Sequence, residues 1–494
     1  MKKGIPKIKI PIRPNEFTIE SAEKYLDKVF EKFQFNASQI RKDYDMYCLD
    51  HPILTKVRTH DDTDVNNIIL VPDLKAMVDW KTGYCFGNPI KYAQNKSTDT
   101  DDINYLNKYI RYVCQRAVDK EVGKWAFATG VGYYFIEPES KSFDIETESP
   151  YVLYHRESDS CAKVYSSYNG NEALFDILYT TYKEIDDVQV EKEVYVLDLY
   201  TRNSLYTYEK RFGDTKWVRK TTQERGMDKP LPLVEKRLNE DGIGMVAMGA
   251  TLQYAVDKIL SNGLDNIEDI VNEVFVYKNV LLGKTPEEKA EAHRKMRKSG
   301  AIELISNNKD LQADVTTIST KLSLGEVKEL FGLINEKFHS SLGVPMEISG
   351  TNSGGTTKQG SEVANGYDNA YNRALDDINT FLVADTELLK KILWICKNSG
   401  NTVNDLSASE IEIKYSLNLT DNMLTKSQSY GTFIQTMPPS MALRLTRLSN
   451  DPEAEGKLIE QSEIYKAFLA NLTPTQANKD ETLYLDSQDE QLDK

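Results

Sequence analysis

The chain has 494 residues, of which 40% are hydrophobic and 28% charged, a composition typical of folded proteins and not of disordered or collagen-like ones. Its 61 basic and 76 acidic side chains give a formal net charge of -15, which argues against tight wrapping of many phosphates unless the charge is strongly segregated. The five cysteines lie far apart without CxxC spacing, so we expect reduced thiols and no structural zinc or redox motif.

The sequence gives no sign of export or of membrane insertion. Lys7 and Lys9 alternate with isoleucines where a signal peptide needs a continuous apolar run. The most apolar stretch, residues 243–256, is shorter than the roughly 20 residues that span a bilayer. We therefore expect neither a signal peptide nor a transmembrane helix.

The first third of the chain is predicted to be mainly helical. Apolar side chains at helical spacing predict helices at residues 19–33, 37–47, 73–83 and 101–127. Gly130 and Gly132 are expected to end the last of these before a strand at 133–136. A short extended piece is expected at 88–92.

Residues 151–220 are rich in Tyr, Val, Leu and Thr, and this composition predicts several antiparallel strands. The many tyrosines could form a base-stacking surface, or they could serve simply as strand formers with one polar end. The sequence leaves both interpretations open.

Residues 252–275 are predicted to form an amphipathic helix with one continuous apolar stripe. The opposite face carries five acidic side chains and, between residues 254 and 275, only Lys258 as a base. A solvated face and the wall of a channel would both produce this pattern. The five acidic residues are Asp257, Asp265, Glu268, Asp269 and Glu273.

A small α/β insert follows, and then a second amphipathic helix. The insert is predicted to contain a strand at 274–282, a helix at 286–298 and strands at 301–305 and 314–318. Ser323 and Glu326 form a capping-box pattern that starts a helix ending near residue 342. Two amphipathic helices around a small insert indicate an antiparallel pair with the insert at its tip.

The C-terminal part begins with a glycine-rich loop at 343–360. A long helix is predicted at 361–397, with Asp385 interrupting its apolar stripe, and a strand at 410–417. Three more helices are expected at 421–435, 440–448 and 452–469. Residues 480–494 hold six acidic side chains and one basic, which is typical of a flexible acidic tail.

The motifs of common enzymes are incomplete in this sequence. Two segments approach a P-loop: 283–285, where Lys278 replaces the required glycine, and 350–356, where Thr356 occupies the position of the lysine. The G-x-S-x-G turn is absent around Ser353, and the five histidines do not cluster. We therefore expect no catalytic, cofactor-binding or metal site.

Five segments, in this order, together resemble the portal proteins of tailed bacteriophages, which form a ring at one capsid vertex. They are residues 79–92 (DWKTGYCFGNPIKY), 129–133 (TGVGY), 415–421 (YSLNLTD), 439–443 (PSMAL) and 450–455 (NDPEAE). The resemblance implies an α+β portal fold with a mainly helical core, an antiparallel strand-rich wing, paired stem helices, a small α/β clip and a helical crown. It places the wing at 1–251 and 361–418, the stem helices at 252–275 and 323–342, the clip at 276–322, the tunnel loop at 343–360, the crown at 419–479 and the acidic tail at 480–494.

The resemblance also implies a function that is not enzymatic. A homo-oligomeric ring, expected to be a dodecamer, would serve as the conduit for double-stranded DNA in packaging and ejection, without sequence specificity and without a membrane. Implied partners are the large terminase, the major capsid and scaffold proteins and the head-to-tail adaptor proteins. The implied location is the virion portal vertex, and the host cytoplasm during assembly.

A conduit for DNA should be acidic or sparsely basic, because every fixed cation would hold a phosphate and resist movement. The acidic residues of helix 252–275 would then line the tunnel. In the tunnel loop, Lys358 would touch the DNA backbone weakly, or it is an ordinary solvated lysine. The residues expected to face DNA are Ser349, Thr351, Asn352, Ser353, Thr356, Thr357 and Lys358.

Residues 284–298 carry six basic and three acidic side chains, a local charge of +3. This helix would dock the packaging motor or an adaptor, or it is an ordinary charged surface helix with internal pairs. The expected docking residues are Lys289, Arg294, Lys295, Arg297 and Lys298. Two other functions stay open: a nucleotide-driven DNA motor or nuclease, and a minor capsid protein without a channel.

Overall fold

The computed structural model divides the chain into two compact units, Met1–Asn418 and Leu419–Lys494. Within some helices and strands only the backbone is described. The described residues are 4–57, 66–94, 101–139, 148–168, 172–185, 191–226, 228–271, 274–278, 285–299, 314–318, 324–346, 360–399, 403, 405–417, 423–446, 448–449, 452–463 and 465.

A six-stranded sheet in the first unit has the strand order β1-β5-β6-β7-β8-β9. Its shortest strand, β1 (Ile8–Ile10), pairs in parallel with β5 (Cys161–Ser166), and all other neighbours are antiparallel. The other strands are β6 (Ala173–Ile185), β7 (Glu191–Tyr200), β8 (Ser204–Arg211) and β9 (Val218–Glu224). The predicted antiparallel strands are confirmed, whereas the pairing of the N-terminal strand was not predicted.

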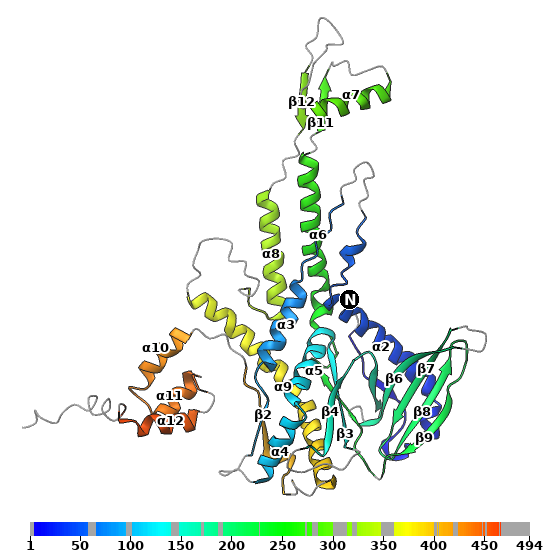
Figure 1. The fold of residues 1–494 in the computed structure, drawn as a ribbon, viewed down its shortest axis with the longest axis vertical. Helices are drawn as coiled ribbons and strands as arrows, with labels where there is room; N and C mark the ends of the chain where they lie inside the picture. The colour runs from blue at the N-terminus through cyan, green and yellow to red at the C-terminus, as the bar shows by residue number, and fades with distance from the viewer. Residues whose placement is uncertain are drawn as a thin grey trace, which may run out of the picture. The chain divides into compact units, whose positions relative to one another are not determined.

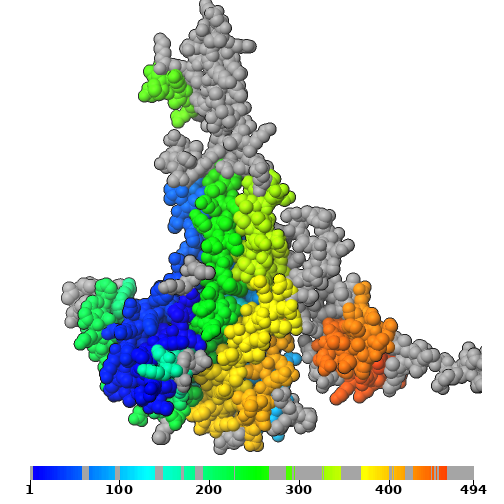
Figure 2. Space-filling model, turned by 180° about the vertical axis from the view of Figure 1, so that it is seen from behind, coloured from blue at the N-terminus to red at the C-terminus, as the bar shows by residue number. Residues whose placement is uncertain are grey.

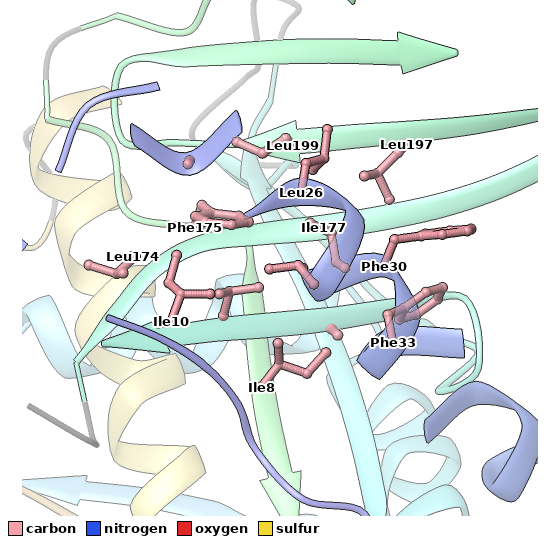
Figure 3. Close-up of a cluster of buried hydrophobic side chains, with 14 of the residues drawn as sticks. Ile8, Ile10, Leu26, Phe30, Phe33, Leu174, Phe175, Ile177, Leu197 and Leu199 are labelled. Atoms are coloured by element: carbon pink, nitrogen blue, oxygen red, sulfur yellow. The ribbon is translucent and has the colours of Figure 1, made fainter. Parts of the chain in front are cut away.

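One face of this sheet is covered by α2 (Leu26–Tyr47), which follows the short α1 (Ile19–Glu23) (Figure 3). Phe30 and Phe33 of α2 pack on Ile177 and Leu197 of the sheet. The two predicted helices at 19–33 and 37–47 are therefore wrong in their division, because a single helix continues through residues 34–36. Asn36 is buried in that stretch and donates from Nδ2 to the Pro6 carbonyl at 2.9 Å.

A second, three-stranded sheet has the order β10-β3-β4 and packs against α5 (Gln115–Thr129). Its strands are β3 (Val131–Pro138), β4 (Tyr151–Arg156) and β10 (Leu233–Arg237). Tyr133, Tyr134 and Tyr151 are fully or almost fully buried here. Of the tyrosines in residues 151–220, some are buried and unavailable for base stacking (Tyr151, Tyr165, Tyr200 and Tyr208), and others are exposed (Tyr154, Tyr168 and Tyr182). Both interpretations of these tyrosines therefore stay open.

The predicted helix at 101–127 is two helices, α4 (Asp101–Tyr112) and α5 (Gln115–Thr129). The helix breaks at Cys114, whose φ of 51° is left-handed and cannot continue an α-helix. Gly130, with φ of 97°, ends α5, as its position in the sequence predicted. Segments far apart in the sequence meet beside these helices, since β2 (Lys91–Gln94), which follows α3 (Asp73–Phe86), pairs antiparallel with β13 (Ile411–Lys414).

Two long helices, α6 (Met245–Val271) and α8 (Leu324–Leu342), lie side by side (Figures 1 and 2). Between them in the sequence, β11 (Val274–Lys278) pairs antiparallel with β12 (Asp314–Ile318), and α7 (Pro286–Ser299) separates the two strands. The expected strand at 301–305 and the capping residue Ser323 lie outside the described residues. The 40-residue α9 (Gly360–Ser399) packs on β10.

The second unit contains α10 (Met423–Phe433), α11 (Pro439–Thr446) and α12 (Pro452–Gln461). These match the three helices predicted there, although residues 466–494, including the expected acidic tail, lie outside the described residues. A Cβ at Gly456 would lie 2.6 Å from Ser440 Cα. The helices α11 and α12 therefore approach so closely that only glycine fits at position 456.

Most strands lie in one stretch of the chain, from β3 to β10, and pair mainly antiparallel, while most helices lie before or after that stretch, which confirms the predicted α+β class. In the part of the chain that the structure describes, every helix is too short or too polar to cross a bilayer.

Candidate functional site

The two predicted amphipathic helices pack against each other as α6 and α8. Val256 of α6 and Phe338 and Leu342 of α8 are buried, so the apolar stripes meet as the spacing predicted. A Cβ at Gly249 would lie 2.8 Å from Phe338 Cε2 and 2.8 Å from Leu74 Cδ1. Glycine at this position therefore allows α8 and α3 to approach α6 closely.

The other side of α6 is occupied by a segment that we call the clasp, residues 51–57 and 66–72. Its first part contains a short 3-10 helix, η2 (Pro52–Thr55), and its second part, 66–72, belongs to no helix or strand. Four backbone N–H groups at 67–74 donate to four polar side chains of α6, which we call the polar ladder. The bonds are Asn67 N to Asp265 Oδ1 at 2.7 Å, Ile69 N to Ser261 Oγ at 2.9 Å, Val71 N to Asp257 Oδ1 at 3.0 Å and Leu74 N to Gln253 Oε1 at 2.9 Å.

The polar ladder forms because the spacing of the side chains along α6 matches the spacing of the backbone donors along the clasp. Its side chains recur every fourth residue of α6, and the first three donors recur every second residue of the clasp. Four helical residues rise about 6 Å and two extended residues rise about 6.6 Å, so the atoms stay in register over this length. The clasp consequently runs antiparallel to α6, and the backbone N–H groups of Asn67, Ile69 and Val71 are satisfied without a neighbouring strand.

One ion pair and one histidine–carboxylate contact reinforce the polar ladder. His51 Nδ1 lies 2.8 Å from Asp257 Oδ2, and Lys56 Nζ lies 2.6 Å from Asp265 Oδ2. Burial by itself raises the pKa of the Asp265 carboxyl, but hydrogen bonds from Lys56 and from the Asn67 amide outweigh burial and lower the pKa below its ordinary value. Asp265 is therefore held as a carboxylate inside the protein.

The expectation that Asp257 and Asp265 line a tunnel is wrong. The two side chains belong to residues that are 0% and 2% exposed, and the clasp covers them. A buried carboxylate needs hydrogen-bond partners, and the clasp supplies these, so neither side chain faces a lumen. The side chains of Glu268, Asp269 and Glu273 lie outside the described residues.

Sequence reasoning recognised the charge on this face and missed the polar ladder. The available signal was the spacing of Gln253, Asp257, Ser261 and Asp265, four hydrogen-bonding side chains at successive intervals of four. A face that is only solvated does not require polar side chains at every fourth position, and it does not explain why two of the four, Gln253 and Ser261, are uncharged.

A second polar cluster lies inside the first unit, around Lys236 of β10. Lys236 Nζ forms an ion pair with Asp385 Oδ1 of α9 at 2.7 Å, and the Tyr415 hydroxyl donates to the other oxygen of the same carboxylate. The Nζ also lies 5.1 Å from the ring centroids of both Phe86 and Phe381. We call this cluster the Lys236 centre.

Segments that carry the portal resemblance meet at the Lys236 centre. Phe86 belongs to segment 79–92, Tyr415 begins segment 415–421, and Tyr134, directly after segment 129–133, has its ring centroid 5.3 Å from Lys236 Nζ. Asp119 accepts from the Tyr134 hydroxyl at 2.9 Å, and burial raises the pKa of its carboxyl to about 7. These segments thus build one interior rather than an exposed reactive site.

The helix expected to dock a partner, α7, begins with a capping box. Thr285 N donates to Glu288 Oε2 at 3.4 Å, and Glu288 N donates to Thr285 Oγ1 at 3.3 Å. Lys289 and Arg294 are exposed. The side chains of Lys295, Arg297 and Lys298 lie outside the described residues, so their docking role stays a prediction.

The residues expected to face DNA in the tunnel loop all lie outside the described residues, which stop at Met346 and resume at Gly360. The start of the loop is described: Gly343 ends α8 with φ of 67°, and Val344 N donates to the His339 carbonyl at 3.1 Å. Among the described residues, no cluster of three His, Cys, Asp or Glu side chains could hold a metal ion.

Residues 26–466 match the family described as phage portal protein, SPP1 Gp6-like. The chain belongs to this family. The portal protein of Bacillus phage SPP1 is 25% identical over 303 residues, which cover 56% of this chain and 56% of that protein. The match to this phage portal relative therefore spans only a little over half of its length.

Two solved structures show a weaker likeness. A chain from the neck of an empty GTA particle computed with C6 symmetry is 13% identical, with a TM-score of 0.40, covering 76% of this chain and 88% of that chain. A chain from the neck of a native GTA particle computed with C12 symmetry is 12% identical, with a TM-score of 0.37, covering 78% and 96%.

Proposed function

We propose that this chain is the portal protein of a tailed phage and that its copies close into a ring, a dodecamer, around a channel for double-stranded DNA. The family match across residues 26–466 carries this proposal. The packed pair of α6 and α8, with a small β-paired insert between them, supports it. The ring would act without enzymatic turnover, at the portal vertex of the virion and, during assembly, in the host cytoplasm.

Within this proposal, residues 252–275 and 323–342, which include most of α6 and all of α8, form the stem, residues 276–322 the clip, 343–360 the tunnel loop and 419–479 the crown. Residues 1–251 and 361–418 form the wing, and 480–494 the tail. The second compact unit begins at Leu419, a boundary that suits the proposed crown.

The proposed lining of the channel omits Asp257 and Asp265, because both are buried under the clasp. Glu268, Asp269 and Glu273 remain the proposed acidic lining of the stem. The proposed contacts with DNA are Ser349, Thr351, Asn352, Ser353, Thr356, Thr357 and Lys358. Acidic or uncharged walls let a polyanion slide, since they form no fixed phosphate contacts.

The proposed partners are the large terminase, the capsid and scaffold proteins and the head-to-tail adaptor proteins. The exposed bases of α7 support docking through the clip. Reversing Arg294, Lys295 and Arg297 to Glu should weaken terminase docking while rings still form. Docking that is unchanged by this triple reversal would reject the role of α7.

Electron microscopy of the purified full chain tests the channel, with an ATP hydrolysis assay beside it. We expect rings with a central hole and no ATP turnover above a buffer control. Steady ATP turnover would favour a DNA motor, and assemblies without a hole would favour a minor capsid protein.

A further inference from the structure

The clasp and α8 lie on opposite flanks of α6. Figure 1 shows the clasp on one side of α6 and α8 on the other, and Figure 2 shows the same order from behind. The hydrogen bonds of the polar ladder attach the clasp to α6, and Phe338 and Leu342 attach α8. The stem of one chain is therefore three elements wide, with the clasp at one edge.

Each outer flank exposes large apolar side chains. On the clasp, Leu54 is 46% exposed, Val57 84% and Ile68 41%. On α8, Leu330 is 50% exposed and Leu333 54%. Several large apolar side chains left in water on the same short segment indicate a surface that another molecule covers.

The exposed leucines of α8 do not belong to its contact with α6. At about 100° per residue, Leu333 lies about 140–180° around α8 from Phe338 and Leu342, on the opposite face, and Leu330 lies about 80–120° from them, at the side of the contact face. On the other flank, the ladder bonds turn the clasp backbone towards α6, and Leu54, Val57 and Ile68 remain accessible. Both patches are consequently available when the chain is alone.

We propose that the clasp patch (Leu54, Val57, Ile68) of one chain packs against the α8 patch (Leu330, Leu333) of the next chain. This inference rests on the proposed ring and names the surfaces that close it. Two different patches on opposite flanks make a head-to-tail contact, which repeats from copy to copy and forms a ring when the rotation closes. A contact between identical patches would instead stop at a dimer.

The polar ladder then has a role in assembly. It fixes the clasp backbone on α6 and so holds one half of the contact in place before a neighbour arrives. Ordering a flexible segment at the moment of association would reduce affinity, and a clasp already ordered by buried hydrogen bonds avoids that cost.

Cysteine crosslinking tests the pairing directly. In a chain whose exposed Cys48 and Cys114 are changed to Ser, the substitutions Val57→Cys and Leu333→Cys are combined. After mild oxidation, denaturing gels should show a ladder of crosslinked chains that ends at the number of subunits in the ring. Val57→Cys alone and Leu333→Cys alone should give monomers only.

The matched control combines Leu333→Cys with Val218→Cys, because Val218 of β9 is exposed and apolar but lies on the sheet. This pair should give no ladder. Rings in the microscope without crosslinks between positions 57 and 333 would overturn the pairing and leave the proposed function standing. Dimers from either single variant would also overturn it, and a chain that forms no rings would overturn the proposed function itself.

Discussion

The Lys236 centre and the polar ladder both bury aspartates, but they satisfy them in different ways. At the Lys236 centre, β10, α9 and the segment at Tyr415 bring a cation, a carboxylate and a hydroxyl together among aromatic rings. In the polar ladder, one helix satisfies the backbone of one extended segment with evenly spaced side chains. The first is a three-dimensional cluster, and the second is a linear repeat.

This difference predicts different responses to mutation. Removing one charge from the Lys236 centre leaves its partner without compensation in the interior. Removing one rung of the polar ladder leaves one or a few hydrogen bonds unmade while the other rungs hold the clasp. A single substitution in the Lys236 centre should therefore cause a large loss of stability, and a single substitution in the polar ladder should cause a smaller one.

The largest effect is expected from Lys236→Met. This change leaves Asp385 buried without its cation, and we expect a loss of about 3–5 kcal/mol in the free energy of unfolding, measured in urea. The double variant Lys236→Met/Asp385→Asn removes both charges and should recover part of the loss. If the double variant is no more stable than Lys236→Met, the loss of stability does not come from the uncompensated charge of Asp385.

A pH effect of similar origin is expected from Asp119. Its folded pKa of about 7 is raised by burial above the ordinary 3.8, so wild-type stability from this group is present at acid pH and is lost as pH rises from about 4 through 7. Asp119→Asn mimics the protonated form. Its advantage over wild type should grow across that range by about 4 kcal/mol and then level off. A constant difference between the two proteins from pH 4 to 8 would contradict the raised pKa.

A smaller effect is expected from Asp257→Ala. It removes the acceptor of His51, of the Val71 amide and of Gln253, and we expect a loss of about 2–3 kcal/mol in the unfolding free energy. Hydrogen exchange at residues 66–72 should rise more than exchange in β10. Equal rises in both regions would mean that the clasp is not a separate unit of stability.

The smallest effect is expected from Ser261→Ala, which removes one rung and leaves the Ile69 amide unpaired. The predicted loss is about 1 kcal/mol, again with faster exchange confined to the clasp. Ser340→Ala on α8 is the matched control, because its exposed hydroxyl bonds only within its own helix and should change stability by less than about 0.5 kcal/mol. Equal changes in unfolding free energy for the two substitutions would show that the hydrogen bond from the Ile69 amide to Ser261 does not contribute to stability.

Sequence reasoning predicted the elements with strong local patterns. The stripes of α6, α8 and α9 and the Tyr-rich strands follow from periodicity, and the interruption of the α9 stripe at Asp385 coincides with the Lys236 centre. Sequence reasoning could not show that Lys236 is the partner of Asp385, because the two residues are 149 positions apart in the chain. Which polar face is buried depends on what covers it, and the clasp has no periodic pattern of its own.

The same limit explains the other misses. The break at Cys114 depends on one left-handed residue inside an otherwise helical pattern. The parallel pairing of β1 with β5 joins segments about 150 residues apart, a contact that local alternation does not encode. The site residues of the tunnel loop remain predictions from the family resemblance.

The most direct test of the account is the mass of the assembled particle, measured by native mass spectrometry for wild type and for Leu330→Ser/Leu333→Ser. We predict that wild type forms one closed species of fixed subunit number. The variant, whose fold should be unchanged because both positions are exposed, should remain largely monomeric at the same concentration. A wild-type protein that stays monomeric under all assembly conditions would contradict the ring on which the proposed function depends.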